Sequence, residues 1–235
     1  TAPVPLARAL GQQVGEIYAR IHHSKGVDLR TGTSVKEWHK SADRVTSVTL
    51  SDGRTEEADM VLVAIGIDPN LDLPKAFGLA IEGGGVPVDE GLRAADHVYV
   101  GGDIALHHHP VLKRAIRVEH WEVAKGHGRG IAASIAEGHT PYAKLPYFWS
   151  DQYDVNLEYR GHASGDDKVV WRGDRDALAF SVFYLRDGLV AGVLSMNDKK
   201  TNELGGELIE RRLPIGESVL ASADVDLAEL AGITS

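Results

Sequence analysis

The stretch from Val98 to Asp103, Val-Tyr-Val-Gly-Gly-Asp, constrains the fold more than any other part of the chain. A short β-branched and aromatic run predicts a buried strand. In α/β proteins such strands bring ligand-binding residues to the carboxyl edge of a sheet. The two glycines lack a Cβ, so a ligand can approach the backbone closely. Asp103 can then accept hydrogen bonds from hydroxyl groups; the alternative is an aspartate in an ordinary turn, where Gly-Asp is common.

Further segments, taken together with this one, resemble a known enzyme family. Ala58–Asn70 ends in Ala-Ile-Gly-Ile-Asp-Pro-Asn, and Arg117–Trp121 is followed by Pro146–Tyr153, which contains Phe-Trp-Ser-Asp-Gln-Tyr. In this order they resemble the FAD-dependent pyridine-nucleotide oxidoreductases. Within that superfamily they are similar to the ferredoxin and putidaredoxin reductase branch and to the related apoptosis-inducing-factor branch. The resemblance covers nearly the whole chain, from Pro3 to about Pro214.

The nucleotide-binding fingerprints of this family are missing from the sequence. The family carries two Gly-x-Gly-x-x-Gly motifs, one for FAD and one for the nicotinamide cofactor, each opening a βαβ unit. Gly126–Gly130 has a different spacing and lies in a predicted helix, and Gly83–Gly85 is a loop without a following helix. We therefore expect the C-terminal portion only of such a flavoprotein, and the start at Thr1 without an initiator methionine agrees with a truncated or processed piece.

The expected fold class is α/β and α+β: the C-terminal part of a flavoprotein reductase with two dinucleotide-binding domains, plus a small α+β C-terminal domain. Apolar residues at three- and four-residue steps predict an amphipathic helix over Pro5–Ser24. Met60–Ile65 is an apolar run that we expect to be fully buried. We expect residues 1–65 to close the NAD(P)-binding domain, residues 66–144 to return to the FAD-binding domain, and residues 145–235 to form the small reductase domain.

Alternating apolar and polar residues predict antiparallel strands at both ends of the chain. Near the N-terminus the expected strands are Val27–Thr31, Ser34–Trp38 and Val45–Leu50, followed by a hairpin turn at 51–54 and a short return strand. In the small domain they are Asn156–Tyr159, Lys168–Arg172, Ala179–Leu185 and Leu189–Met196. A helix is expected to follow, from about Asn202 to Arg212.

The resemblance implies a flavin site around Asp103, with FAD and NAD(P)H as cofactors. In the family the counterpart of Asp103 binds the ribitol of FAD, and Gly102 lets the chain approach it. Val118–Glu137 is a predicted helix whose N-terminus faces the flavin, where its partial positive charge favours reduction. His120 and Trp121 lie in its first turn and match flavin-contacting positions; the alternatives are a capping or core histidine and a packed tryptophan.

Three more residues match cofactor-binding positions. Glu119 matches a position near the nicotinamide, where a carboxylate can hold the carboxamide NH₂; equally, it can stabilise the helix dipole. Gly66 lies where the chain crosses between the two dinucleotide-binding domains, and it offers backbone to the nicotinamide, forms a turn, or does both. Trp149 resembles the aromatic residue that covers the exposed edge of the flavin; the alternative is a core tryptophan of the small domain.

Two clusters of basic residues suggest further functions. Lys113, Arg114 and Arg117 form either a solvated loop, a contact for cofactor phosphate, or a docking patch for an acidic ferredoxin-type iron–sulfur protein. The run His107–His109 resembles a metal-binding tract. Consecutive residues do not easily converge on one ion, so we expect a surface loop there and no metal site.

The composition argues against several other classes. No segment approaches the ~20 apolar residues of a membrane helix, and there is no apolar leader, so we expect neither a membrane span nor secretion. The absence of cysteine excludes disulfides and thiolate metal sites and fits a cytoplasmic protein. The net charge of −9 argues against nucleic acid as a partner, because phosphate binding requires basic patches.

The implied activity is that of an FAD-dependent oxidoreductase, which takes hydride from NAD(P)H and passes electrons to a ferredoxin-type iron–sulfur protein. Two alternatives stay open. The apoptosis-inducing-factor branch uses the fold for redox sensing and carries a long insertion in the small domain, which the short Gly161–Lys168 turn lacks. Without the two pyrophosphate-binding loops, the chain is alternatively a fragment with no activity of its own, exposing surface that those loops cover.

Overall fold

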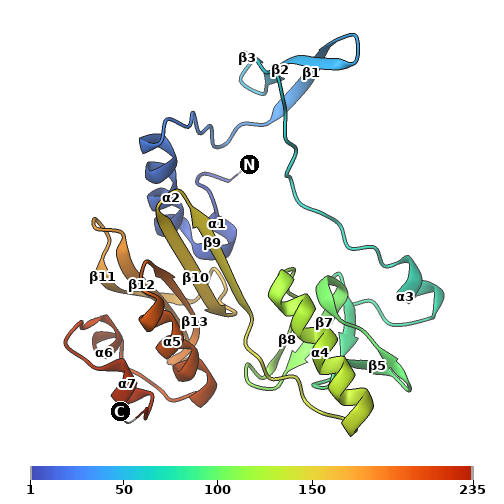
Figure 1. The fold of residues 1–235 in the computed structure, drawn as a ribbon, viewed down its shortest axis with the longest axis vertical. Helices are drawn as coiled ribbons and strands as arrows, with labels where there is room; N and C mark the ends of the chain where they lie inside the picture. Colours follow the sequence, from blue (N-terminus) through green and yellow to red (C-terminus); the bar gives the residue numbers. More distant parts are fainter. Residues whose placement is uncertain (1, 234–235) are drawn as a thin grey trace. The chain divides into compact units, whose positions relative to one another are not determined.

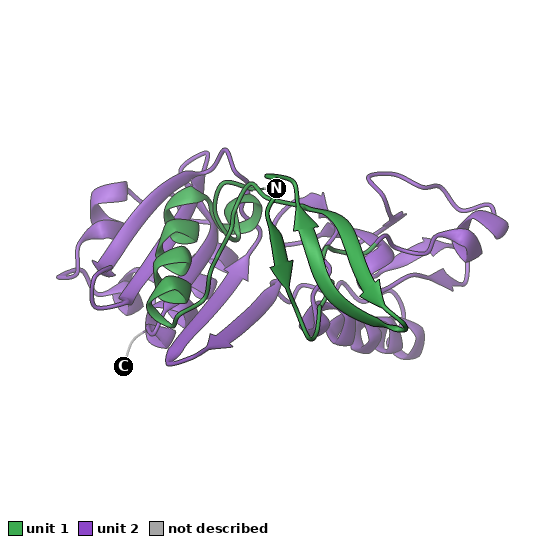
Figure 2. Ribbon diagram, turned by 90° about the horizontal axis from the view of Figure 1, so that it is seen from above, with its two compact units in different colours: residues 1–67 green, residues 68–235 purple. Residues whose placement is uncertain are grey.

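The structure is a computed structural model that describes residues 2–233. Contacts divide the chain into two compact units, Thr1–Ile67 and Asp68–Ser235 (Figure 2). Helices and strands occur in both (Figure 1), which confirms the mixed α/β and α+β class expected from the sequence. Within residues 2–233, no helix is long and apolar enough to cross a membrane.

The first unit combines a helical segment with a small antiparallel sheet. Its elements are α1 (Ala7–Leu10), α2 (Gln12–Ser24), β1 (Val35–Ser41), β2 (Arg44–Leu50) and β3 (Thr55–Glu57). The helix expected over Pro5–Ser24 is interrupted at Gly11, whose φ of 86° lies outside the helical range. The amphipathic spacing is confirmed, since the buried side chains of α2 are Val14, Ile17, Tyr18 and Ile21.

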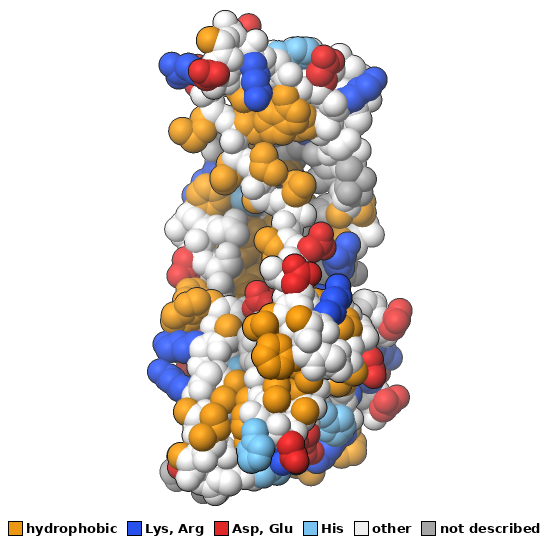
Figure 3. Space-filling model, turned by 90° about the vertical axis from the view of Figure 1, so that its right-hand side faces the viewer, with side chains coloured by type: hydrophobic (Ala, Val, Ile, Leu, Met, Phe, Trp, Pro, Cys, Tyr) orange, Lys and Arg blue, Asp and Glu red, His pale blue; other side chains and the backbone are white. Residues whose placement is uncertain are grey.

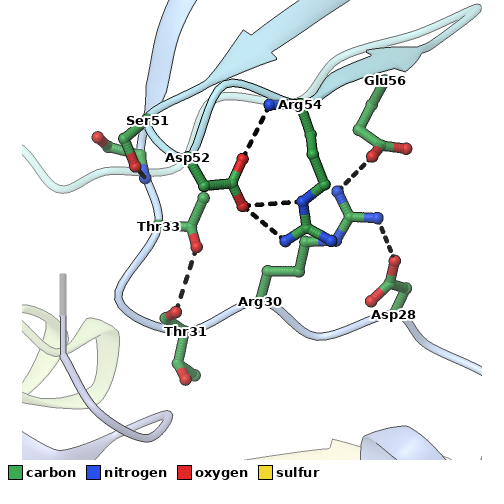
Figure 4. Close-up of polar contacts among 9 residues, drawn as sticks. Asp28, Arg30, Thr31, Thr33, Ser51, Asp52, Arg54 and Glu56 are labelled. Carbon is green, nitrogen blue, oxygen red and sulfur yellow. Dashed lines mark hydrogen bonds and ion pairs between the residues drawn. The ribbon is translucent and has the colours of Figure 1, made fainter.

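The expected hairpin is confirmed, because β2 pairs antiparallel with β3 across the turn at 51–54. Val27–Thr31, in contrast, is not a strand. In that segment Arg30 donates hydrogen bonds of 2.5 Å to Glu56 and to Asp28 (Figure 4). Charged side chains at these positions bind each other instead of alternating with apolar residues across a sheet.

The expectation of a buried strand at Met60–Ile65 is wrong. Met60, Leu62 and Ile65 are 87%, 88% and 93% exposed, and no strand among residues 2–233 pairs with this segment. A continuous apolar strand is stable when neighbouring strands and helices cover both of its faces, and the described residues give this run no such cover. Figure 3 shows one face of the molecule, on which hydrophobic side chains lie open among charged ones.

The first half of the second unit combines short strands with one long helix. Its elements are α3 (Asp72–Ala76), β4 (Val86–Val88), β5 (Arg93–Ala95), β6 (Val98–Tyr99), η1 (Gly102–Ile104), β7 (Ala105–His109), β8 (Arg114–Ile116) and α4 (Trp121–Glu137). β7 lies between β4, which runs parallel to it, and β8, which runs antiparallel. The strand expected before Asp103 is short: β6 pairs with β5 as a two-stranded ribbon, and the chain then turns into η1.

The second half is an antiparallel sheet with helices packed on it. Its elements are β9 (Tyr147–Gln152), β10 (Val155–Gly161), β11 (Lys168–Asp174), β12 (Ala179–Arg186), β13 (Leu189–Met196), α5 (Lys199–Arg211), α6 (Glu217–Ala221) and α7 (Leu227–Leu230). The sheet order is β11-β12-β13-β10-β9 (Figure 1). The strands β10 to β13 and the helix that follows them match the sequence prediction within a few residues, whereas β9 is an additional edge strand. Leu208 and Ile209 of α5 join Phe183 and Val193 in the core.

Candidate functional site

The Gly101–Gly102 turn packs against α4. A Cβ at Gly101 would lie 2.9 Å from Cδ1 of Ile131 and 3.1 Å from Cβ of His127, so these neighbours would have to shift to admit a side chain. Gly102 has a φ of 75°, which favours glycine for conformational reasons, and a Cβ built there would lie 3.6 Å from the Cβ of Ala124. Gly102 is half-buried, so part of its backbone remains accessible to a ligand.

Arg117 connects this turn to the start of α4. Its Nη1 donates a hydrogen bond of 3.0 Å to the backbone carbonyl of Asp103 and one of 2.6 Å to Oε1 of Glu119. The carboxylate of Asp103 itself has no hydrogen-bond or ion-pair partner among residues 2–233. The arrangement fixes the backbone of Asp103 and leaves its side chain available to a ligand.

The basic group before α4 is mostly committed to internal contacts. Arg117 binds as just described, and Arg114 donates 2.7 Å from Nη2 to the carbonyl of His162 and also contacts Nδ1 of that ring. Burial lowers the pKa of Arg114. Lys113 is exposed. Two of the three residues therefore do not form the free basic patch that their spacing in sequence indicates.

The N-terminus of α4 opens toward solvent without a side-chain cap. His120 is the N-cap, with φ −118° and ψ 137°, and its side chain makes no capping hydrogen bond. Trp121, the first helical residue, is 65% exposed. The helix is 17 residues long, so its first N–H groups and its dipole can act on an anionic group placed at this end.

His120 is largely buried and neutral. Burial lowers its pKa, and the carboxylates of Asp103 and Glu119 oppose this shift only in part. Its Nδ1 is buried and has no hydrogen-bond partner within the described residues. His120 packs edge-on against Phe148, with 4.8 Å between ring centroids. His120 thus occupies the N-cap position without a capping hydrogen bond, and its half-buried ring is not that of a fully buried core histidine.

An open aromatic pocket of about 480 Å³ lies between the start of α4 and β9. Its lining residues are Glu119, His120, Trp121, Glu122, Tyr147, Phe148 and Trp149. Trp121 meets Trp149 edge-on at 6.2 Å, and Trp149 stacks on Tyr147 at 5.8 Å between ring centroids. Trp149 is 46% exposed, which is the exposure of a rim residue and not of a core tryptophan.

Strand pairing holds the aromatic residues of β9 in place. Tyr147 donates a 2.6 Å hydrogen bond from its hydroxyl to Oε1 of Glu158 on β10. Burial and this carboxylate raise the pKa of Tyr147 to about 12. Phe148 stacks on Tyr159 at 5.0 Å. Side chains alternate along a strand, so Tyr147 and Trp149 share one face while Phe148 faces the other.

Sequence reasoning missed a buried histidine cluster next to the turn. His107 and His109 are each 1% exposed and lie on β7, so the expectation of a surface loop at His107–His109 is wrong. His109 accepts hydrogen bonds from the backbone of Val111 and Leu112, and His127 accepts one from Gly102. Alternation along a strand and glycines four residues apart in a helix, at 126 and 130, are the signals that could have indicated these contacts.

The clustered histidines do not form a metal site. No group of three or more histidine, cysteine or acidic side chains in the described part of the chain could hold a metal ion. Burial lowers the pKa of both His109 and His127 to about 4. These rings are therefore neutral members of the core at neutral pH.

Gly66 belongs to the first unit, Thr1–Ile67. It lies in an irregular segment, is exposed, and has a φ of 101°. That conformation favours glycine, but the segment forms no turn at this position. The remaining candidates, Gly102, Asp103, Glu119, His120, Trp121 and Trp149, all belong to the second unit.

The residues present in the second unit fit a flavin. Gly102 offers half-buried backbone, Asp103 offers a carboxylate without a hydrogen-bond partner among residues 2–233, and the start of α4, which has no side-chain cap, offers N–H donors. The pocket beside them is aromatic and open. Ligand sites of this kind pair apolar walls with a few polar groups that fix orientation.

Comparison with protein families gives two matches that together span most of the chain. Residues 1–128 match the pyridine nucleotide-disulphide oxidoreductase family, and residues 147–231 match the reductase C-terminal family. Putidaredoxin reductase CamA of Pseudomonas putida is 34% identical over 234 residues, which is 98% of this chain and 55% of that protein. The chain thus spans about half the length of the curated relatives it matches.

Solved structures agree with these matches. A ferredoxin reductase from Rhodopseudomonas palustris superposes with a TM-score of 0.89 at 32% identity, covering 98% of this chain and 57% of that one. The covalent putidaredoxin reductase–putidaredoxin complex gives a TM-score of 0.87 at 33% identity, covering 96% and 56%. Since the first family model matches 128 of the 235 residues, the chain belongs to the pyridine nucleotide-disulphide oxidoreductase family.

Proposed function

We propose that this chain is part of an FAD-dependent NAD(P)H oxidoreductase that passes electrons to a ferredoxin-type iron–sulfur protein. One observation carries the proposal: Arg117 joins the backbone of Asp103 to Glu119, which lines the aromatic pocket at the start of α4. A polyol-binding carboxylate, a helix N-terminus and an aromatic rim thus belong to one site. The names of the putidaredoxin and ferredoxin reductases that the chain resembles support the same activity.

Each residue of the site has a distinct role in this proposal. Asp103 accepts hydrogen bonds from the ribitol hydroxyls, and Gly102 gives the cofactor room beside the backbone. The first N–H groups of α4 favour negative charge on the pyrimidine side of the ring. Trp149 shields the exposed ring edge. When bound, FAD would supply the redox chemistry, which is two-electron exchange with NAD(P)H and one-electron transfer to the acceptor.

Glu119 and His120 adjust the charge near the helix start. The 2.6 Å contact with Arg117 offsets the negative charge of Glu119, and the second carboxylate oxygen of Glu119 stays available to accept from the carboxamide of the nicotinamide. Burial keeps His120 neutral. Neither residue acts as a general acid or base in this mechanism, because hydride transfer needs none from the protein.

The domain roles are also part of the proposal. Residues 1–65 close the NAD(P)-binding domain, residues 66–144 return to the FAD-binding domain, and residues 145–235 form the small reductase domain. The division of contacts at Ile67 and the reductase C-terminal match over 147–231 support these bounds. We place the protein in the cytoplasm, a location supported by the absence of cysteine.

The apoptosis-inducing-factor alternative fits this chain less well. That branch carries a long insertion in the small domain, whereas here β10 ends at Gly161 and β11 begins at Lys168. The two functions differ in kinetics. A reductase reduces ferredoxin rapidly after NAD(P)H is added, and a redox sensor instead holds a long-lived charge-transfer absorption.

Titration of the purified chain with FAD tests the site directly. We expect quenching of FAD fluorescence on binding, with a dissociation constant that Asp103→Ala raises about tenfold, since hydrogen bonds to a charged group contribute ~1.5–3 kcal/mol. Asp96→Ala is the matched control, because Asp96 is an exposed aspartate in the turn between β5 and β6. Equal affinities for wild type and Asp103→Ala would refute the role given to Asp103.

A further inference from the structure

His127 lies directly beneath the turn that the flavin must approach. The backbone N–H of Gly102 donates a 3.1 Å hydrogen bond to Nδ1 of His127, and the residue is 3% exposed. We propose that His127 is a positioning residue, which holds the Gly101–Gly102 turn in the form that admits the flavin cofactor. This role rests on the proposed function and extends it to a residue of α4 that does not line the pocket.

The turn needs such a contact because two successive glycines are otherwise mobile. Glycine loses more conformational entropy on ordering than any other residue. Gly102 also adopts a φ of 75°, and its N–H would lack a partner inside the fold without the imidazole. Nδ1 of His127 therefore accepts the hydrogen bond of the Gly102 N–H and stabilises the turn conformation that precedes Asp103.

His127 is itself held rigidly by aromatic neighbours. Its ring meets His107 edge-on at 5.4 Å and Tyr142 edge-on at 5.1 Å between centroids. Tyr142 can lie this close to α4 because Gly126 and Gly130 flank the histidine. A Cβ at Gly126 would lie 2.0 Å from the Tyr142 hydroxyl oxygen, and one at Gly130 would lie 2.8 Å from its Cδ2. The two glycines thus create the space for the ring that packs against His127.

The protonation state of His127 suits this role. Nδ1 accepts a hydrogen bond only when it carries no proton, so the hydrogen bond with Gly102 assigns the proton to Nε2. Burial lowers the pKa of His127 to about 4, with His107 and His109 acting in the same direction. The acceptor is therefore present throughout the neutral pH range.

Three variants of the full chain separate positioning from general packing. His127→Asn keeps an acceptor, because Oδ1 of asparagine occupies nearly the same position as Nδ1. His127→Leu fills similar space without an acceptor. His109→Leu is the matched control: it removes a buried histidine of the same cluster that contacts the carbonyl of Lys144 and the ring of His107, not Gly102 or the ring of His127. Thermal unfolding of each variant records whether it folds.

Two measurements test each variant: hydrogen exchange of the Gly102 amide by NMR, and the dissociation constant for FAD. We expect His127→Leu to accelerate Gly102 exchange and to weaken FAD binding, each about tenfold, the equivalent of ~1.4 kcal/mol. His127→Asn should stay within about threefold of wild type, the equivalent of ~0.7 kcal/mol, and His109→Leu should change neither quantity beyond its effect on global stability.

Other results would overturn the proposal. These are unchanged Gly102 exchange in His127→Leu, or equal losses in His127→Leu and His109→Leu. Nitrogen NMR of histidine in the unmutated chain provides a check that needs no variant: we expect the Nε2–H tautomer for His127, and the Nδ1–H tautomer would contradict the hydrogen bond. A wild-type chain that binds no FAD would count against the proposed function, while Gly102 exchange still decides whether His127 holds the turn.

Discussion

Single residues decide how the candidate site is held together. Arg117 reaches both the carbonyl of Asp103 and the carboxylate of Glu119 through one nitrogen. In the sequence it reads as part of a basic run before a helix, and nothing in that pattern distinguishes a solvated arginine from one that bridges two segments. Asp103 and Trp149, in contrast, could be singled out from sequence because each belongs to a specific motif.

Replacement of Arg117 should weaken the site without unfolding the protein. Arg117→Met removes both hydrogen bonds, and we expect FAD affinity to fall about tenfold, the equivalent of ~1.4 kcal/mol. Arg117→Lys keeps the charge but places its nitrogen differently from Nη1 of the guanidinium, so it should recover only part of the affinity. The exposed ion pair with Glu119 contributes little to stability. Unchanged FAD affinity in Arg117→Met would show that the bridge does not position Asp103.

The buried histidines predict a dependence of stability on pH. The pKa values of His109 and His127 are lowered to about 4 in the folded chain, against ~6.5 in an unfolded one. Above pH 6.5 both states are neutral and these groups contribute nothing. Between pH 6.5 and 4 the unfolded chain binds more protons, so the free energy of unfolding should fall as the pH falls, by on the order of 3 kcal/mol for each histidine.

Urea unfolding at a series of pH values measures this loss. His109→Gln removes one of the buried titrating histidines, and its free energy of unfolding should therefore fall less than that of wild type over the same pH window. Parallel curves for the two proteins between pH 6.5 and 4 would contradict the assignment of a buried neutral imidazole at His109.

At the level of elements, close contact between α5 and β13 determines where the helix can accept a residue larger than glycine. A Cβ at Gly205 would lie 2.7 Å from Cγ1 of Val193, whereas one at Gly206 would meet the flexible Arg160 side chain, at 3.1 Å from its Cδ. Both glycines are buried in the same helix. Alanine substitutions at the two positions therefore separate the effect of packing against the sheet from the intrinsic preference of a helix for alanine.

We expect the two alanine substitutions to have opposite effects. Gly205→Ala should destabilise the chain by about 1–3 kcal/mol, because a stiff β-branched side chain must move. Gly206→Ala should be neutral or stabilising by up to ~1 kcal/mol, the difference in helix propensity. Denaturant unfolding of both variants provides the measurement. A loss of stability in Gly206→Ala as large as that in Gly205→Ala would contradict this interpretation.

Elements with local signals were predictable, and those that depend on distant neighbours were not. The strands β10 to β13 and helix α4 follow from alternation, turn residues and periodicity. Met60–Ile65 has the composition of a buried strand, yet the described residues supply no strand to pair with it. His107 and His109 are inward-facing strand residues, but a run of three histidines hides the alternation that would indicate this.

For the whole molecule, two kinds of observation bear on the function: the family matches and the contacts within the second unit. Family matches over residues 1–128 and 147–231 give the family and the class of chemistry. In the second unit, Arg117 ties the backbone of Asp103 to Glu119, which lines the aromatic pocket at the start of α4. The candidate residues could be proposed from motifs, whereas the contacts that Arg117 and His127 make with the glycine turn required the structure.

A visible absorption spectrum of the purified chain with FAD, recorded before and after anaerobic addition of NADH, tests the flavin site most directly. We expect a protein-bound flavin spectrum that differs from that of free FAD, a smaller difference in Asp103→Ala at the same FAD concentration, and bleaching of the flavin band when NADH is added. A spectrum identical to that of free FAD, with no difference between wild type and Asp103→Ala, would contradict the flavin site in this chain.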